Sequence, residues 1–285
     1  MSKLTNYGEN KLADMARGQG LSLAADWTVH LLTAVSDSAH TKVTGAGYAP
    51  VTVARSLTAW AGTQAAASTL ASIGTSHRTS NNELIDFGTG GAGGWSGPAI
   101  AVGLFDGTEL FCWADMDPRT ILEGEPFSFD PGTLIFDLGV TGGMSDYLSN
   151  RLIDLIWRAQ AYSWPATLYA AYTTTTPTNA AGGLEPGVGG YARQPIASSL
   201  SGWTPTQGGL VSDASSGTSG RIGNQAVVTF PAPTANQGVA THGELLDAVS
   251  GGNLMFWRQL AGAKSVVAGG SAPNFASDSL GITWA

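Results

Sequence analysis

Gly47-Tyr48-Ala49 in the first half of the chain recurs as Gly190-Tyr191-Ala192 in the second half, and this repetition shows how the chain is organised. The same spacing of 143 residues separates five further identical pairs, Ser56/Ser199, Leu57/Leu200, Trp60/Trp203, Asn81/Asn224 and Phe87/Phe230. Chance rarely keeps one register over so long a stretch, and an internal repeat determines how the rest of a chain is divided. We therefore predict two diverged copies of one module, joined head to tail.

The repeat extends to both sides of this stretch with small changes of spacing. Upstream, at a spacing of 140, the matches are Tyr7/Tyr147, Asn10/Asn150, Leu12/Leu152 and Asp14/Asp154. Downstream, Leu104-Phe105-Asp106 faces Leu245-Leu246-Asp247, and Trp113 faces Trp257. The glycine-rich residues 139–143 separate the copies, as expected of a short joint. The predicted modules are residues 1–140 and residues 144–285, each near the commonest domain size.

Each copy is predicted to begin with a short helix. In residues 146–160 the apolar residues fall on one helical face, at Leu148, Leu152, Leu155 and Ile156. Either Ser145 or Asp146 can act as the N-cap of this helix. The matching helix in the first copy spans residues 6–17, where Asn6 and Glu9 have the spacing of a capping box.

Short runs of β-branched and aromatic residues follow each helix, bounded by Gly, Pro, Asn and Asp. The predicted strands are 27–33, 84–87, 99–105, 110–113 and 133–138 in the first copy, and 167–173, 226–230, 254–257 and 281–284 in the second. Many short strands behind one helix are typical of small β-sandwiches. The predicted fold class is mainly β, with two tandem antiparallel β-sandwich modules that are jelly-roll-like and carry a short N-terminal α-helix each.

Composition excludes several classes of protein. Hydrophobic residues make up 43% of the 285 residues, which is enough for a sizeable core in each half. The net charge of -8 argues against nucleic-acid binding, because phosphate affinity depends on clustered Lys and Arg. Cys112 is the single cysteine, so a disulfide framework and a cysteine-based zinc site are excluded, and a core position is expected.

The acidity is uneven between the halves. Residues 1–143 carry seven basic and fourteen acidic residues, whereas residues 144–285 carry six and seven. The N-terminus has no apolar run typical of a secretion signal, and no stretch of about 18 apolar residues could cross a bilayer. We expect no membrane insertion, and assembly in the cytoplasm without export.

Gly88-Thr89-Gly90-Gly91-Ala92-Gly93 matches a dinucleotide-binding fingerprint in its letters. That motif requires a helix behind it to hold a pyrophosphate, but Gly94 to Pro98 and another apolar strand follow here. A flexible surface loop is the better interpretation, and the matching residues 231–238 have lost most of the glycines.

Other combinations of polar residues also lack the context that their chemistry needs. His242-Gly243-Glu244 has the H-x-E of zinc deaminases without the cysteines that complete the site. Asp106, Asp115 and Asp117 could hold calcium, but a solvated turn is favoured because the second copy has no matching acids. The four histidines, His30, His40, His77 and His242, are scattered along the chain. A Ser-His-Asp site could still be assembled by folding, but no G-x-S-x-G elbow points to one.

We predict no catalytic, cofactor-binding or metal-binding residues and no cofactor.

The shared aromatic residues, Tyr48/Tyr191, Trp60/Trp203, Phe87/Phe230 and Trp113/Trp257, are interpreted as core residues because they recur within apolar strands. An alternative is a sugar-binding face on which tryptophans serve as stacking platforms. Trp95, Trp157, Trp164 and Trp284 have no identical counterpart in the other copy and are the candidates for exposure.

The second copy resembles a family of small proteins of tailed bacteriophages described as tail fibre or minor virion proteins. The resemblance lies in Gly189 to Ile196, which follows a "GGYAR-Q-x-I" pattern, and in Thr241 to Phe256, which follows a "THFGIFDA-x-GGNLLF" pattern. Tyr147 to Asp154, Leu168 to Thr173, Phe230 to Ala232 and Phe275 to Thr283 match further family segments. The hairpin departs from the family at Thr241 to Leu246, where the family is more apolar, and the duplication exceeds the usual single-module length.

The resemblance implies a non-enzymatic structural protein of the virion. A tail fibre or tail-associated appendage that contacts other virion proteins, and in addition the host surface, is the first hypothesis. The alternatives are a capsid decoration, head fibre or collar (neck) protein, and a carbohydrate-binding module that takes a host surface glycan. Virion parts commonly repeat around an axis, so a symmetric homo-oligomer is expected.

Overall fold

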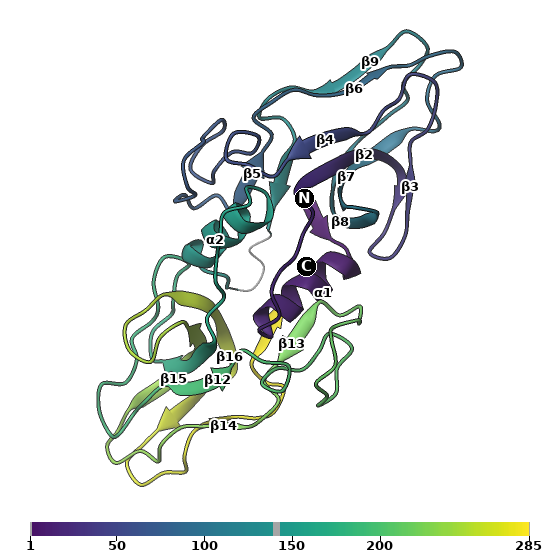
Figure 1. Ribbon diagram of the computed structural model, residues 1–285. Coiled ribbons are helices and arrows are strands. Elements are labelled where there is room, and N and C mark those ends of the chain that lie inside the picture. The colour runs from purple at the N-terminus through teal and green to yellow at the C-terminus, as the bar shows by residue number, and fades with distance from the viewer. Residues whose placement is uncertain (1, 139–142, 285) are drawn as a thin grey trace.

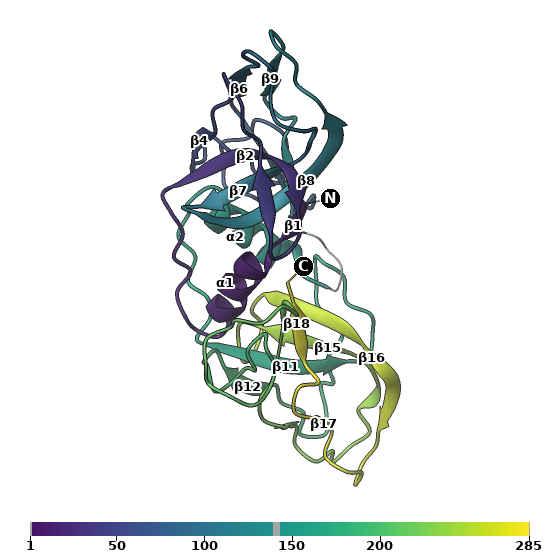
Figure 2. The same ribbon diagram turned by 90° about the vertical axis from the view of Figure 1, so that its right-hand side faces the viewer.

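The computed structural model describes residues 2–138 and 143–284. These two ranges are named the first and the second module here. They stack end to end, with both helices near the junction (Figures 1 and 2). The joint predicted at residues 139–143 lies outside the described residues except for Gly143.

The first module contains one large sheet and two small ribbons. The sheet has the order β1-β8-β7-β2-β3, with β4 also paired to β2, and the ribbons are β10-β5 and β6-β9. All these pairs are antiparallel. The strands are β1 (Ser2–Leu4), β2 (Asp26–Val35), β3 (His40–Lys42), β4 (Val51–Ala54), β5 (Arg78–Ser80), β6 (Ile85–Thr89), β7 (Ala99–Asp106), β8 (Glu109–Arg119), β9 (Pro126–Phe129) and β10 (Ile135–Asp137).

The second module repeats this arrangement with fewer strands. Its sheet has the order β12-β11-β15-β16, and its ribbons are β13-β18 and β14-β17. The strands, again antiparallel, are β11 (Thr167–Thr173), β12 (Gln194–Ala197), β13 (Arg221–Gly223), β14 (Val228–Thr229), β15 (Gly238–Leu246), β16 (Leu254–Val266), β17 (Asn274–Phe275) and β18 (Gly281–Thr283). The predicted fold class, mainly β with antiparallel modules and one short helix each, is confirmed.

The residues shared by the two copies make equivalent contacts and turns in each module. The Tyr48 and Phe87 rings stack at 6.0 Å, and the Tyr191 and Phe230 rings stack at 6.1 Å. Gly47 and Gly190 both have a positive φ, which suits the residue without a Cβ.

Asn81 and Asn224 make the same set of side-chain hydrogen bonds to the backbone in their two modules. Each is fully buried, and each accepts a backbone N–H with its Oδ1 while its Nδ2 donates to carbonyls on two sides. Each also forms a β-bridge with its module's shared tryptophan, Trp60 or Trp203. A buried amide that satisfies several backbone groups fixes one chain path, which explains why both copies keep it.

Helix α1 (Asn6–Ala16) and helix α2 (Asp146–Ile156) begin at matching N-caps. Thr5 and Ser145 each accept the N–H of the residue three positions later. The capping box predicted from Asn6 and Glu9 is therefore wrong, because Asn6 is already the first helical residue. The predicted end of the second helix at residue 160 is also wrong, since regular helix stops at Ile156 and Ala159 has a positive φ.

Each helix reaches into the opposite module. Figure 1 shows α1 beside β13 of the second module and α2 beside β5 of the first. Asn10 Nδ2 donates to the Gly217 carbonyl at 3.1 Å, and Asn150 Nδ2 donates to the Gly74 carbonyl at 3.0 Å. In the same way, Asp14 accepts from the Ser215 N–H, and Asp154 accepts from the Ser72 N–H. Each helix therefore bridges the two modules, because it packs on its own sheet and bonds to a loop of the opposite module through identical residues on both sides.

A single cluster of buried apolar side chains runs through both modules. Trp157, directly after α2, packs 6.1 Å from Phe136 of the first module, which in turn lies 6.0 Å from Trp60. Cys112 is buried in this cluster, as predicted. The core therefore includes the contact between the modules.

Candidate functional site

The histidines singled out in the sequence are not brought together. His30 and His40 both approach the Phe105 ring edge-on, with centroids at 4.9 Å. His77 Nε2 lies 2.8 Å from Asp146 Oδ1, an ion-pair geometry between the modules, and His242 is buried on β15. Across residues 2–138 and 143–284, no group of three or more His, Cys, Asp or Glu side chains could hold a metal ion.

The glycine-rich segment Gly88 to Gly93 forms the end of β6 and a turn, and the next element is β7. Gly88 and Gly93 have a positive φ, which is typical of a loop. The aspartates considered for calcium have other surroundings. The Asp106 carboxylate accepts from the Tyr7 hydroxyl and the Ala24 N–H, both at 2.6 Å, while Asp115 and Asp117 are exposed on β8.

The tryptophans proposed as exposed stacking platforms are mostly core residues. Trp95, Trp157 and Trp284 are buried, and Trp164 is half-buried with its ring 6.4 Å from that of Phe256. The expectation of exposure is therefore wrong for the first three, because their side chains pack in the apolar core that runs through both modules. A sugar-binding face built on them is excluded.

A polar pocket of about 400 Å³ lies in the second module instead. Its walls come from the start of α2, the loop before β12, and the β15–β16 turn. The lining residues are Ser145, Tyr147, 179–183, Glu185, Arg193, Glu244, Leu246 and 251–254. Glycines at 182, 183, 251 and 252 keep the walls thin, and a Cβ on Gly182 would stand 3.0 Å from Glu244 Oε2.

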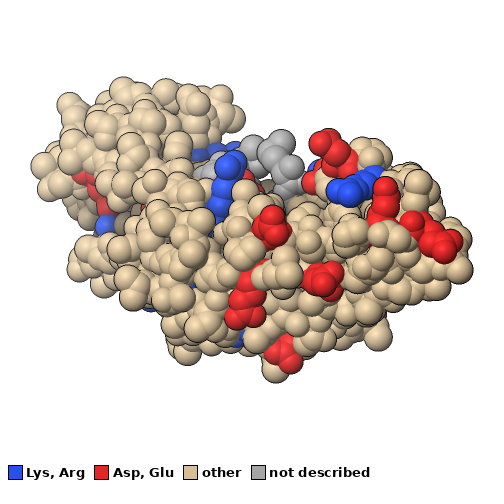
Figure 3. Space-filling model, turned by 90° about the horizontal axis from the view of Figure 1, so that it is seen from above, with Lys and Arg blue, Asp and Glu red and all other residues tan. Residues whose placement is uncertain are grey.

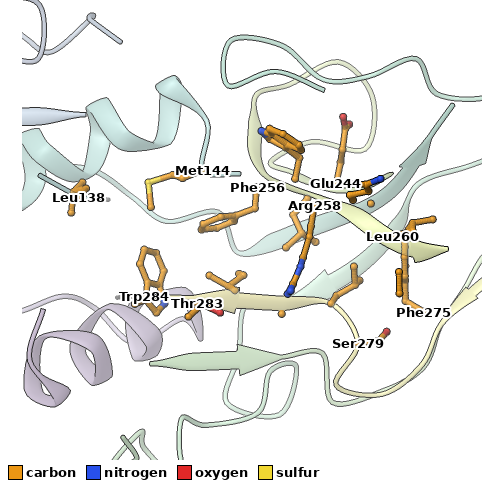
Figure 4. A pocket seen from close by; sticks show the side chains of 18 of the residues that line it. Leu138, Met144, Glu244, Phe256, Arg258, Leu260, Phe275, Ser279, Thr283 and Trp284 are labelled. Carbon is orange, nitrogen blue, oxygen red and sulfur yellow. The ribbon is translucent and has the colours of Figure 1, made fainter. Parts of the chain in front are cut away.

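Glu244 is the buried carboxyl of this pocket, with 1% of its surface exposed. The Gly183 N–H donates to its Oε1 at 2.6 Å, but its Oε2 has no hydrogen-bond partner among the described residues. Burial raises the pKa of Glu244 to about 7, since loss of solvent penalises the charged form. Alternation along β15 places this side chain on one face of the sheet, and in Figure 4 its carboxyl points away from Arg258.

Arg193 and Glu185 form an ion pair and line the same pocket as Glu244. Arg193 Nη2 lies 2.6 Å from Glu185 Oε1, and its Nη1 donates to the Ala248 and Gly251 carbonyls. Glu185 also accepts from the Tyr191 hydroxyl at 2.8 Å. The arginine of the "GGYAR" segment thus fixes the pocket wall.

The sequence prediction missed this pocket. It considered Glu244 only within a deaminase pattern. The available signal was an acidic residue inside an apolar strand, at a point where the related hairpins are more apolar.

An apolar groove of about 660 Å³ opens on the other side of the same sheet. One wall is β16 and the other is β18. Leu138 and Met144 lie at one end and Phe275 at the other, while Arg258 extends from β16 toward β18 (Figure 4). Leu4 of the first module also lines the groove, so both modules form it.

The surface carries few charges. On the face seen in Figure 3, acidic side chains are scattered among uncharged ones, and basic side chains form no broad patch. None of the helices in the described part of the chain is long and apolar enough to cross a bilayer.

The family model of the podophage GP4 fiber I protein gp80 matches residues 3–137 and matches again at residues 143–283. The chain belongs to this family. Two successive matches of one family model agree with the tandem duplication predicted from the sequence and with the repeated strand order. Membership in a phage fibre family makes the chain a structural, virion-associated protein of a bacteriophage. A search of curated proteins found no match.

Proposed function

We propose that the chain is a non-enzymatic tail fibre component or tail-associated appendage, which docks on other virion proteins and contacts the host surface. The family match over both halves carries the proposal. The helices that bridge the modules support it, because two modules joined through a common core form a stiff body.

Exposed apolar side chains give the proposed virion contacts a location. Leu70 and Ile73 are 72% and 77% exposed, only three residues apart on the loop between β4 and β5. Leu210 and Val211 are exposed on the matching loop of the second module. Large apolar side chains gathered on a loop are typical of protein contacts. We expect these loops to touch neighbouring virion proteins, in copies that repeat around the tail axis.

Antibody labelling of intact virions tests the proposed location. Antibodies raised against the purified chain should decorate the tail region in negative-stain images. Labelling confined to heads would exclude the tail placement. A copy number in the hundreds per particle, measured on gels of purified virions, would favour a capsid decoration protein instead.

A further inference from the structure

The two modules are built differently at one equivalent place. In the register of the sheets, Gly103 lies opposite Trp113 and Glu244 lies opposite Trp257. Trp113 and Trp257 are a repeat pair, so Glu244 occupies the position of Gly103. By the same register, Leu246 occupies the position of Phe105.

In the first module this place is filled with apolar side chains. Leu32, Ala101, Phe105, Leu110 and Trp113 form a small buried cluster of their own. Lys42 Nζ covers the Phe105 ring at 4.1 Å from its centroid. The polar pocket is therefore a property of the second module, and the shared fold does not require it.

The unpartnered oxygen of Glu244 is unexpected for a structural residue. A buried polar atom without a hydrogen bond costs stability, and native proteins hold few of them. Glycine at this position avoids the cost, as Gly103 of the first module shows. A ligand that donates a hydrogen bond to Oε2 would satisfy this atom.

The charges around the pocket select the class of ligand. Arg193 and Glu185 neutralise each other in their ion pair, and burial disfavours the charged form of Glu244, so the pocket favours an uncharged ligand. Asn179 lines the pocket, and within its side chain Oδ1 accepts from the Trp257 indole N–H at 3.2 Å while Nδ2 has no bond among the described residues. A hydroxyl can donate to the carboxyl and accept from the free amide N–H₂. The volume of about 400 Å³ lies within the usual range for small-molecule sites.

We propose that this pocket binds one uncharged sugar residue through Glu244 and Asn179, with Tyr147 as an aromatic wall. The proposal rests on the host-contacting role proposed above and gives that role a ligand class.

Saturation-transfer NMR of the full-length chain tests the pocket. The probes are the methyl glycosides of D-glucose, D-galactose, D-mannose, L-rhamnose and N-acetyl-D-glucosamine. We expect at least one to receive saturation from the wild-type protein. Glu244→Gln keeps the shape and the bond from Gly183, so the chain should fold, and binding should weaken about tenfold or more.

Two further variants keep the result interpretable. Leu246→Phe copies Phe105 of the first module into the pocket and should abolish binding by occupying its volume. Glu9→Gln is the matched control, because Glu9 is another buried carboxyl with a raised pKa but does not line the pocket. It should bind like the wild type.

Absence of saturation transfer from all five glycosides would overturn the proposal. So would unchanged binding by both folded pocket variants, or an equal loss in Glu9→Gln. Virion labelling does not depend on the pocket, so a protein that labels tails but binds no sugar would contradict only this inference. A protein that binds sugar while labelling only heads would contradict only the tail placement.

Discussion

Arg17 and Arg158 lie just after the C-terminal ends of α1 and α2, and each bonds to the opposite module. Both are fully buried. Arg17 Nε donates to the Trp203 carbonyl at 3.1 Å, and Arg158 Nε donates to the Trp60 carbonyl at 3.0 Å. The remaining guanidinium nitrogens bond to further carbonyls of the opposite module and to the aspartate on the same helix. A planar fork with five donors suits this task, which lysine could not perform.

Truncation of either arginine should destabilise the protein strongly. In Arg158→Ala, Asp154 loses its buried partner and the Trp60 and Leu70 carbonyls lose their donor. The expected loss is about 3–5 kcal/mol in the free energy of unfolding, measured by urea denaturation. Arg17→Ala should cost a similar amount because its contacts are equivalent. Arg258→Ala, at an exposed arginine, is the control and should change stability by less than about 0.5 kcal/mol.

Two buried glutamates should make stability depend on pH. Burial raises the pKa of both Glu9 and Glu244 to about 7, above the ordinary value of 4.5. The folded state then binds protons more tightly than the unfolded state. This contribution is fully present below pH 4.5 and is lost as pH rises toward 7.

We therefore expect a higher melting temperature at pH 5 than at pH 8. The difference should correspond to at most about 3 kcal/mol for each carboxyl. The double variant Glu9→Gln/Glu244→Gln should flatten this dependence. An unchanged pH profile in the folded double variant would contradict the assignment.

At the scale of elements, the two modules share their strand order and the role of one loop, but the first module has additional strands. The sheets and ribbons correspond, but β1 and β3 are extra strands in the first module. The loops before β5 and β13 each hold the opposite module's helix with backbone groups, and they expose apolar side chains outward. One loop thus combines an internal contact with a surface available to neighbours.

Charged residues on the outward side of the loop before β5 should impair assembly into virions but leave the fold intact. Leu70→Asp/Ile73→Asp places two carboxylates on exposed positions, so the melting temperature should change little. Incorporation into virions, measured by blotting purified particles after complementation, should fall severalfold. Leu122→Asp, at a residue 59% exposed on another loop, is the control. Normal incorporation of the double variant would show that this loop is not an interface.

At the scale of the molecule, the two halves should hold together without a covalent link. Each helix is anchored in the opposite module by hydrogen bonds and shares its core. A protease site placed between Leu138 and Gly143 of the folded chain should allow complete cleavage. The fragments should still elute as one species of about 29 kDa. Separation of the fragments in native buffer would contradict the conclusion that the helices and the common core hold the two modules together.

Much of the fold follows from sequence patterns. The 143-residue spacing predicts the duplication, and strand β11 at Thr167–Thr173 has the bounds predicted from its β-branched and aromatic residues. Short strands such as β5 and β13 escape prediction, because three residues are too few to show an alternation of their own. They become strands only when β10 and β18 lie alongside.

From the sequence alone follow the mainly β class, through local periodicity, and the tandem repeat, through residues kept in both copies. The phage fibre kinship follows from the segments that resemble that family. The three-dimensional structure was needed to show that the helices bridge the two modules, that Trp95, Trp157 and Trp284 are buried, and that Glu244 stands in a polar pocket. Those features depend on which surfaces meet across more than a hundred residues. A helix with one apolar face carries no information about which of two similar modules will cover it.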